Sequence, residues 1–136
     1  MTTSSYSYRK TGKTNAERHC RLTLPFPPSV NHYWVPNGRG GRRISNKGRV
    51  YRADVEAVVF DELRGWEAMT GPLRVTVTAT MPDRRKRDVD NLFKAPLDAL
   101  EHCRVFEDDN QVYRLLIERV AVEKPGHIVV EITQDP

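Results

Sequence analysis

The chain has 136 residues, of which 38% are hydrophobic, so its length is that of one ordinary globular domain. Its net charge is +4, it holds two cysteines, and no apolar run approaches the roughly 20 residues that span a bilayer. These properties argue against a disulfide-stabilised scaffold and against a membrane protein. The first residues also lack the apolar core of a signal peptide, so we expect a soluble, cytoplasmic protein.

Charge is distributed unevenly along the chain. Residues 1–52 carry 11 Lys and Arg residues against one acid, whereas residues 53–136 carry 11 against 17 acids. The two parts therefore have net charges of +10 and −6, which give the +4 of the whole chain. This asymmetry suggests one surface for phosphates and a separate set of carboxylates. The alternative is that the basic half is mostly a solvated tail.

The first fifty residues predict little regular structure. Residues 1–20 are polar and basic without an apolar period, which predicts a flexible tail ahead of a single domain at residues 21–136. Alternating residues from Arg21 to Phe26 predict a strand that prolines close. Residues 36–49 are rich in glycine and arginine and predict a mobile basic loop.

The rest of the chain predicts two helices and three strands. Ser45 or Asn46 can cap a helix that ends near Leu63. A second helix is predicted at Ala95–His102, because Pro96 fits a helix best in its first turn. Alternating or β-branched residues predict strands at 73–80, 112–122 and 127–133. The order β-α-β-α-β-β predicts an α+β domain, with a mixed four-stranded sheet and helices on one face.

The most informative segment begins directly after the second predicted strand. Four basic residues in a row attract a polyanion, and two carboxylates that would repel it, Asp88 and Asp90, follow at once. The basic residues are Arg84, Arg85, Lys86 and Arg87. Acids beside phosphate-seeking cations make sense if a divalent metal lies between acid and phosphate. The pattern therefore indicates metal-dependent chemistry on nucleic acid, although a charge run alone is often only a solvated surface.

Asp109 is the candidate for a third metal ligand. Asp88 and Asp90 share a face if the backbone is extended there. The intervening helix advances about 12 Å, and the six residues up to Asp109 reach about 20 Å, so closure within one chain is allowed. Three carboxylates suit Mg²⁺, with Mn²⁺ as the alternative ion.

Two neighbouring polar residues have competing interpretations. Lys94 lies four residues after Asp90, so on a helical turn its ammonium can face the scissile phosphate or form a surface ion pair. Asn91 can hold a phosphate or a ligand carboxylate, or can simply form a turn. Tyr33 and Trp34 can stack on bases, but a hydrophobic anchor is the simpler role for them.

These residues carry a resemblance to a known family. The segment PDRRKRDVDNLFKAPLDAL, followed by FEDDNQV, resembles the core of the RusA-like crossover junction endodeoxyribonucleases, the Holliday junction resolvases of bacteria and their phages. The earlier LPFPPSVNHYW and the basic loop are similar to the first strand and loop of that family, so the resemblance covers about residues 21–133.

The resemblance implies a mechanism and a set of roles. The catalytic acids would be Asp88, Asp90 and Asp109, the essential lysine would be Lys94, and DNA contacts would include Arg87 and Asn91. It further implies a bacterial or phage-encoded, Mg²⁺-dependent homodimer that nicks opposed strands of a four-way DNA junction, without a membrane or a small-molecule cofactor. A two-fold dimer suits paired cuts, because such a junction has an approximate two-fold axis.

The expected DNA surface joins the acidic segment to the basic loop. It comprises Arg84, Arg85, Lys86, Arg87, Asn91, Arg39, Arg42 and Arg43. Two other hypotheses stay open at this point. One is a non-catalytic DNA-binding module in which the acids cap helices or bind a structural ion, and the other is a nuclease for different branched DNA, such as forks or flaps.

Overall fold

A computed structural model gives the fold and describes residues 17–136, so most of the predicted tail, residues 1–16, lies outside it. The elements in chain order are β1 (Arg18–Pro25), α1 (Val30–Tyr33), β2 (Trp34–Pro36), β3 (Arg42–Ile44), α2 (Asn46–Glu62), β4 (Leu73–Met81), the 3₁₀ turn η2 (Val89–Leu92), α3 (Lys94–His102), the 3₁₀ turn η3 (Asp109–Gln111), β5 (Val112–Val122) and β6 (His127–Gln134).

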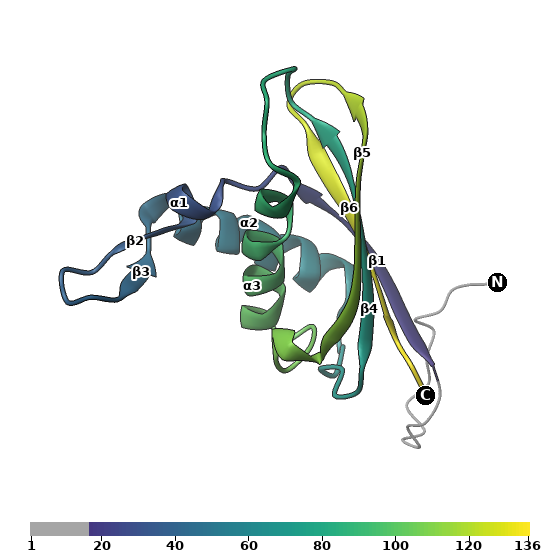
Figure 1. Cartoon of the computed structure of the whole chain (residues 1–136). Coiled ribbons are helices and arrows are strands. Elements are labelled where there is room, and N and C mark those ends of the chain that lie inside the picture. Colours follow the sequence, from purple (N-terminus) through teal and green to yellow (C-terminus); the bar gives the residue numbers. More distant parts are fainter. Residues whose placement is uncertain (1–16) are drawn as a thin grey trace.

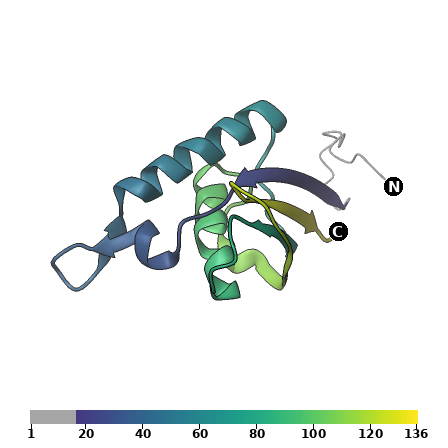
Figure 2. The ribbon, with the colours of Figure 1, turned by 90° about the horizontal axis from the view of Figure 1, so that it is seen from above.

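The main sheet has the strand order β1-β6-β4-β5. β6 runs antiparallel to both β1 and β4, whereas β5 runs parallel to β4 because α3 carries the chain back to the starting end of the sheet. The two longer helices, α2 and α3, cover the same face of this sheet (Figures 1 and 2). The predicted α+β class, the mixed four-stranded sheet and the one-sided helix layer are therefore confirmed.

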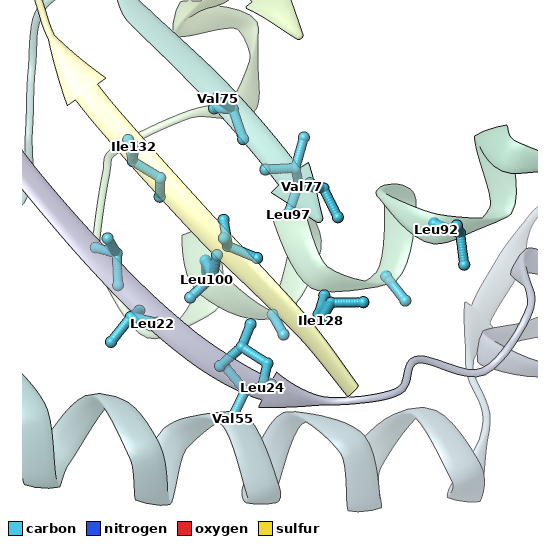
Figure 3. Close-up of a cluster of buried hydrophobic side chains, with 14 of the residues drawn as sticks. Leu22, Leu24, Val55, Val75, Val77, Leu92, Leu97, Leu100, Ile128 and Ile132 are labelled. Carbon is cyan, nitrogen blue, oxygen red and sulfur yellow. The ribbon is translucent and has the colours of Figure 1, made fainter. Parts of the chain in front are cut away.

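Alternation along the strands places the core between the sheet and the helices. Every second residue of β1, β4 and β6 points toward α2 and α3, and these side chains are buried. Figure 3 shows them meeting the apolar side chains of the two helices. The residues labelled there are Leu22, Leu24, Val55, Val75, Val77, Leu92, Leu97, Leu100, Ile128 and Ile132.

Both helix starts agree with the sequence. The Ser45 side chain accepts a hydrogen bond from the Gly48 backbone N–H at 2.9 Å and so caps α2. Pro96 lies in the first turn of α3, where an unpaired backbone donor would otherwise be left.

β1 begins earlier than the sequence predicted. Residues 18–20, which the sequence assigned to the tail, are its first three residues. Arg18 is buried because its guanidinium lies 4.4 Å from the centre of the Trp66 ring and donates to the Glu67 carbonyl oxygen at 2.9 Å. A charged residue that packs on an aromatic ring leaves no apolar signal in the sequence.

The predicted loop at residues 36–49 is largely ordered structure, so this prediction was wrong. β2 and β3 form a two-stranded hairpin that projects away from the sheet (Figure 1). The Asn37 side-chain oxygen accepts hydrogen bonds from the Arg39 and Gly41 backbone N–H groups, and Gly38 has a positive φ of 83°. The turn is thus held by a side-chain amide and glycine rather than by apolar residues.

A buried tyrosine fastens the hairpin to both helices. The Tyr33 hydroxyl donates to the Asp98 carboxylate of α3 at 2.5 Å, and Arg52 of α2 donates to the same carboxylate at 2.9 Å. Burial, followed by the hydrogen bond to Asp98, raises the pKa of Tyr33. Tyr33 is fully buried, so the hydrophobic-anchor interpretation applies to it, while the ring of Trp34 lies 4.5 Å away in an edge-on contact.

A matched pair of substitutions on α2 tests the position of the core. Val55 is fully buried and Val50 is 61% exposed. Val55→Ala should lower the free energy of unfolding by roughly 2 kcal/mol, because it removes two buried carbon groups and leaves a cavity. Val50→Ala should change it by less than about 0.5 kcal/mol. Urea denaturation followed by circular dichroism measures both, and equal losses would contradict the packing described above.

Candidate active site

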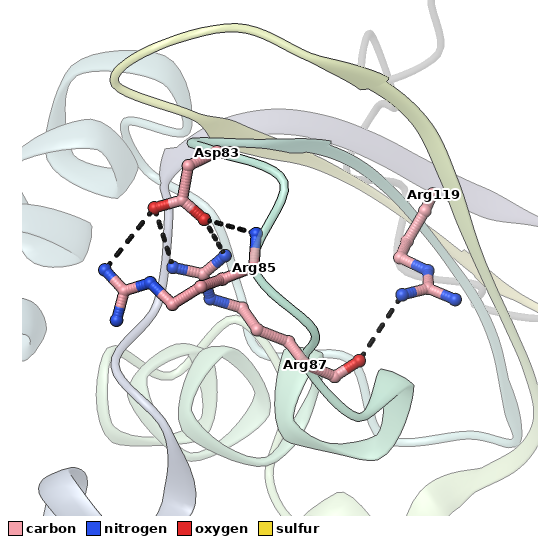
Figure 4. A network of polar contacts seen from close by, with 4 residues as sticks. All are labelled: Asp83, Arg85, Arg87 and Arg119. Carbon is pink, nitrogen blue, oxygen red and sulfur yellow. Dashed lines mark hydrogen bonds and ion pairs between the residues drawn. The ribbon is translucent and has the colours of Figure 1, made fainter.

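The loop that follows β4 is folded around one carboxylate. Asp83 accepts a hydrogen bond from the Arg87 guanidinium at 2.6 Å and another from the Arg85 backbone N–H at 2.9 Å (Figure 4). The Arg87 guanidinium also lies 5.5 Å from the centre of the Phe26 ring, and its backbone carbonyl accepts from Arg119 at 3.3 Å. Arg87 therefore holds this loop together through its guanidinium and its backbone carbonyl.

The basic run divides into two kinds of residue. Arg85 and Arg87 form ion pairs with Asp83, whereas Arg84 and Lys86 are exposed and have no such partner within residues 17–136. Arg84 and Lys86 are consequently the two cations of the run that are fully available to an incoming phosphate.

Asp88 and Asp90 come next, at the beginning of η2. Asp88 is the extended residue before this turn and Asp90 lies in it, and both are exposed. The Asn91 side-chain oxygen accepts a hydrogen bond from the Val30 backbone N–H at 3.2 Å, which ties η2 to α1. Asp88 and Asn91 line a hollow of about 320 Å³ together with Lys86, Arg87, Leu92, Phe26, Pro27 and Ser29.

Lys94 is the first residue of α3 and is exposed. Its ammonium lies 5.7 Å from the centre of the neighbouring Phe93 ring. Within the described part of the chain it forms no ion pair with Asp90, so the surface ion pair considered from the sequence is not formed.

Asp109 belongs to a different group of acids. One oxygen each from Glu101, Asp108 and Asp109 lie within 4.8 Å of one another. The Asp109 backbone N–H donates to Glu101 at 3.1 Å, and Asp108 caps η3 by accepting from the Asn110 backbone N–H. Burial raises the pKa of Glu101, and the charges of Asp109 and Asp108 add to this rise.

The two acidic groups lie at opposite ends of α3. Asp88 and Asp90 precede the helix, whereas Asp109 follows it at the end from which β5 starts (Figure 1). A nine-residue helix is about 13 Å long. Within residues 17–136 of one chain, Asp109 is brought together with Glu101 and Asp108, and not with Asp88 and Asp90.

The remaining basic candidates lie on the projecting hairpin. Arg39 is in its turn, and Arg42 and Arg43 are in β3; all three are exposed. The Arg42 guanidinium lies 5.3 Å from the centre of the Trp34 ring, a cation–π contact that steadies its position. The hairpin is therefore a basic arm that extends from the helix layer.

Comparison with known protein sequences places this chain in a family. The family model described as "Endodeoxyribonuclease RusA" matches residues 25–133. The chain belongs to the RusA family. It is 37% identical over 113 residues to a crossover junction endodeoxyribonuclease RusA of Shigella sonnei, with 83% of this chain and 92% of the relative covered. It is 36% identical over 113 residues to the Escherichia coli K12 protein of that name, with the same coverage. It is 37% identical to the one from Enterobacteria phage HK97, with 84% and 93% covered.

The RusA match spans all of the proposed site residues, including the basic arm. Sequence reasoning found the two aspartates after β4 but missed Asp83 and Glu101. Asp83 is bound by Arg85 and Arg87 of its own loop, and Glu101 lies beside the acids of η3. A single carboxylate in a polar segment gives no signal of either role. Among residues 17–136, no helix is long and apolar enough to cross a membrane.

The carboxylates of this RusA chain suit a hard divalent cation. Asp88 and Asp90 supply exposed oxygen donors beside free basic side chains, and the second group supplies three more acids. Oxygen donors of this kind fit Mg²⁺ and Mn²⁺ better than softer metals.

The Asp83 contact predicts a measurable titration. The Arg87 guanidinium, followed by the Arg85 backbone N–H, holds the pKa of Asp83 well below its ordinary value of 3.8. The contact therefore stabilises the fold above about pH 3.8 and is lost as the pH falls through the lowered folded-state pKa. Arg87→Ala should raise the pKa of Asp83 toward 3.8, as read from the carboxyl carbon by NMR.

Arg85→Ala is the matched control, because the backbone N–H of residue 85 still donates to Asp83. The pKa of Asp83 should move less in this variant than in Arg87→Ala. An unchanged titration in Arg87→Ala would show that this guanidinium does not hold the loop.

Proposed function

We propose that this chain is a divalent-metal-dependent endonuclease that resolves four-way DNA junctions by paired nicks as a homodimer. The observation that carries the proposal is the pair of exposed aspartates directly after β4, beside free cations, in a chain that belongs to the RusA family. The relatives are named for action at crossover junctions, which supports a branched DNA substrate and a place in DNA recombination or repair.

Each group in the site has a chemical task in this proposal. Asp88 and Asp90 would hold the metal, which when bound supplies an acidified water and neutralises charge on the scissile phosphate. Lys94, at the start of α3, would place a positive charge near the same phosphate. Arg84 and Lys86 would bind phosphates of the DNA backbone next to the scissile phosphate. Asn91 and Arg87 would fix the loop that carries Asp88 and Asp90.

The basic arm would contact a different part of the substrate. Its arginines project beyond the helix layer, and phosphates bound there would orient a branched DNA without reading its sequence. Such contacts predict binding that weakens steeply as salt is added.

We further infer that a second copy supplies the third acid. In one chain α3 separates Asp109 from Asp88 and Asp90. A two-fold dimer can bring Asp109 of the partner subunit to the first aspartate pair, and the same operation completes a second site. Two equal sites are what paired cuts at a junction require.

Removal of one carboxylate tests the metal-ligand role. Asp90→Asn should reduce Mg²⁺-dependent nicking of a synthetic four-way junction by at least 100-fold, because a ligand charge is lost, while junction binding stays intact or tightens. Asp61→Asn, which changes an exposed acid at the far end of α2, is the control and should nick normally.

Loss of binding together with nicking in Asp90→Asn would contradict the ligand role. Absence of metal-dependent nicking in the unmodified protein would instead favour a non-catalytic DNA-binding module. Equal cleavage of forks, flaps and junctions would favour a nuclease of broader branched-DNA specificity.

A mixing experiment tests whether the site is shared between subunits. Asp90→Asn and Asp109→Asn should each be inactive alone. In a mixed dimer one shared site carries both changes and the other carries neither, so mixing the two variants should restore single nicks in about half of the dimers. No restoration after subunit exchange would show that each site draws its acids from one chain.

A further inference from the structure

A second hollow lies beside the one that holds Asp88. Its volume is about 450 Å³, and we call it the proline hollow. Its apolar walls are formed by Pro25, Phe26, Pro27, Pro28, Val50 and Tyr51. Phe26 and Pro27 also line the hollow that contains Asp88 and Lys86, so the two hollows share a wall.

The walls of the proline hollow are fixed by the chain itself. Three of the four residues from Pro25 to Pro28 are prolines, whose rings lock the backbone φ angle. The buried Tyr51 donates its hydroxyl hydrogen to the Pro25 carbonyl oxygen at 2.9 Å, which ties the segment after β1 to α2. On the other side, the Arg87 guanidinium lies 5.5 Å from the centre of the Phe26 ring. The hollow is therefore shaped before a ligand arrives.

Polar groups surround this apolar interior. Asn46 and Lys47 of the first turn of α2 line the hollow, and so does Asp54 further along the helix. Lys47 is exposed and forms no ion pair with any residue of the described range 17–136. The Asn46 side-chain oxygen accepts from the Arg49 guanidinium at 2.9 Å, and its amide nitrogen supplies donors. Donors and an acceptor are thus both present around the hollow.

The chemistry of the two adjoining hollows selects one class of ligand. The first offers carboxylates for a cation and basic groups for a phosphate, and the second offers apolar walls with a polar surround. A nucleotide has the same division, because one sugar joins a charged phosphate to a base with apolar faces and hydrogen-bonding edges. An aliphatic side chain of a peptide would contact the walls but would leave the polar groups unused.

We propose that the proline hollow receives an unstacked base of the DNA strand whose phosphate lies at Asp88 and Asp90. The inference rests on the proposed function, since it requires a strand at those aspartates. The faces of the base would contact Phe26 and Val50, and its edge would meet Lys47 or Asp54. Contact with an aromatic ring and apolar side chains compensates for the stacking that the base loses in the DNA.

Such a base pocket adds a means of selecting branched DNA. Phosphate contacts are similar on linear and branched duplexes, so they discriminate little between the two. A base next to the exchange point of a junction has lost part of its regular stacking and costs less to extrude than a base inside a duplex. Capture of that base would therefore favour the junction.

A fluorescent base tests whether extrusion occurs. A synthetic junction carries 2-aminopurine, which brightens when it unstacks, at one position next to the exchange point in each of a set of molecules. The protein is added with a chelator, so that the DNA stays intact, and binding is followed by anisotropy. One of these positions should brighten on binding, whereas 2-aminopurine in the middle of an arm should not change.

A thermodynamic cycle tests whether that base enters the proline hollow. Val50 is 61% exposed, so Val50→Trp fills the hollow without entering the core. It should weaken binding of the intact junction by about tenfold, because the stacking contact is lost. It should not weaken binding of a junction that has an abasic residue at the position that brightens. Ala57→Trp adds the same bulk at an exposed position of α2 outside the hollow and should leave both affinities unchanged.

The results distinguish this proposal from other occupants and from the proposed function. Equal weakening of the intact and abasic junctions by Val50→Trp overturns base capture, and so does a changed oligomeric state of this variant without DNA. Nicking by an unmodified protein that brightens no position overturns base capture and leaves the nuclease standing. Brightening and the expected cycle in a protein that nicks nothing support base capture and overturn the nuclease. A protein that binds no junction overturns both.

Discussion

The packing of α3 on the sheet is the constraint on which the candidate site depends. Leu97 and Leu100 of α3 are buried and face the sheet (Figure 3), so the helix cannot tilt or slide without opening the core. Its two ends are therefore held about 13 Å apart, with one acidic group at each end. Within residues 17–136, one chain therefore keeps its two acidic groups apart, and this separation follows from core packing rather than from the acids themselves.

Much of the fold could be predicted because its main elements use the hydrophobic pattern directly. β4 alternates buried and half-buried residues, and α2 begins at a serine cap, so both leave clear signals. The hairpin was missed because its turn depends on the Asn37 amide and on glycine. The first strand was predicted too short because its first residue, Arg18, is buried against the Trp66 ring. Both misses involve polar groups, because Asn37 bonds to the backbone of its own turn and Arg18 contacts residues far away in the sequence, and neither contact has an apolar signal.

The site was predictable in composition but not in geometry. The aspartates after β4, the basic run and Lys94 were all visible as residue types at informative spacings. Chain-length estimates showed only that Asp109 could reach Asp88 and Asp90. They did not show in which direction the chain runs after α3. The segment after α3 leads into η3, which Asp108 caps. The hydrogen bond from the Asp109 backbone N–H to Glu101 holds Asp109 at the C-terminal end of α3.

The contact between Tyr33 and Asp98 has a mechanical consequence. Asp98 lies one turn after Lys94 on α3, and Tyr33 lies at the root of the basic arm. Tyr33 is fully buried, and Arg52 donates to the same Asp98 carboxylate. The arm is therefore fixed to α3 by buried contacts. A force applied to the arm is thus transmitted to α3, the helix that begins at Lys94.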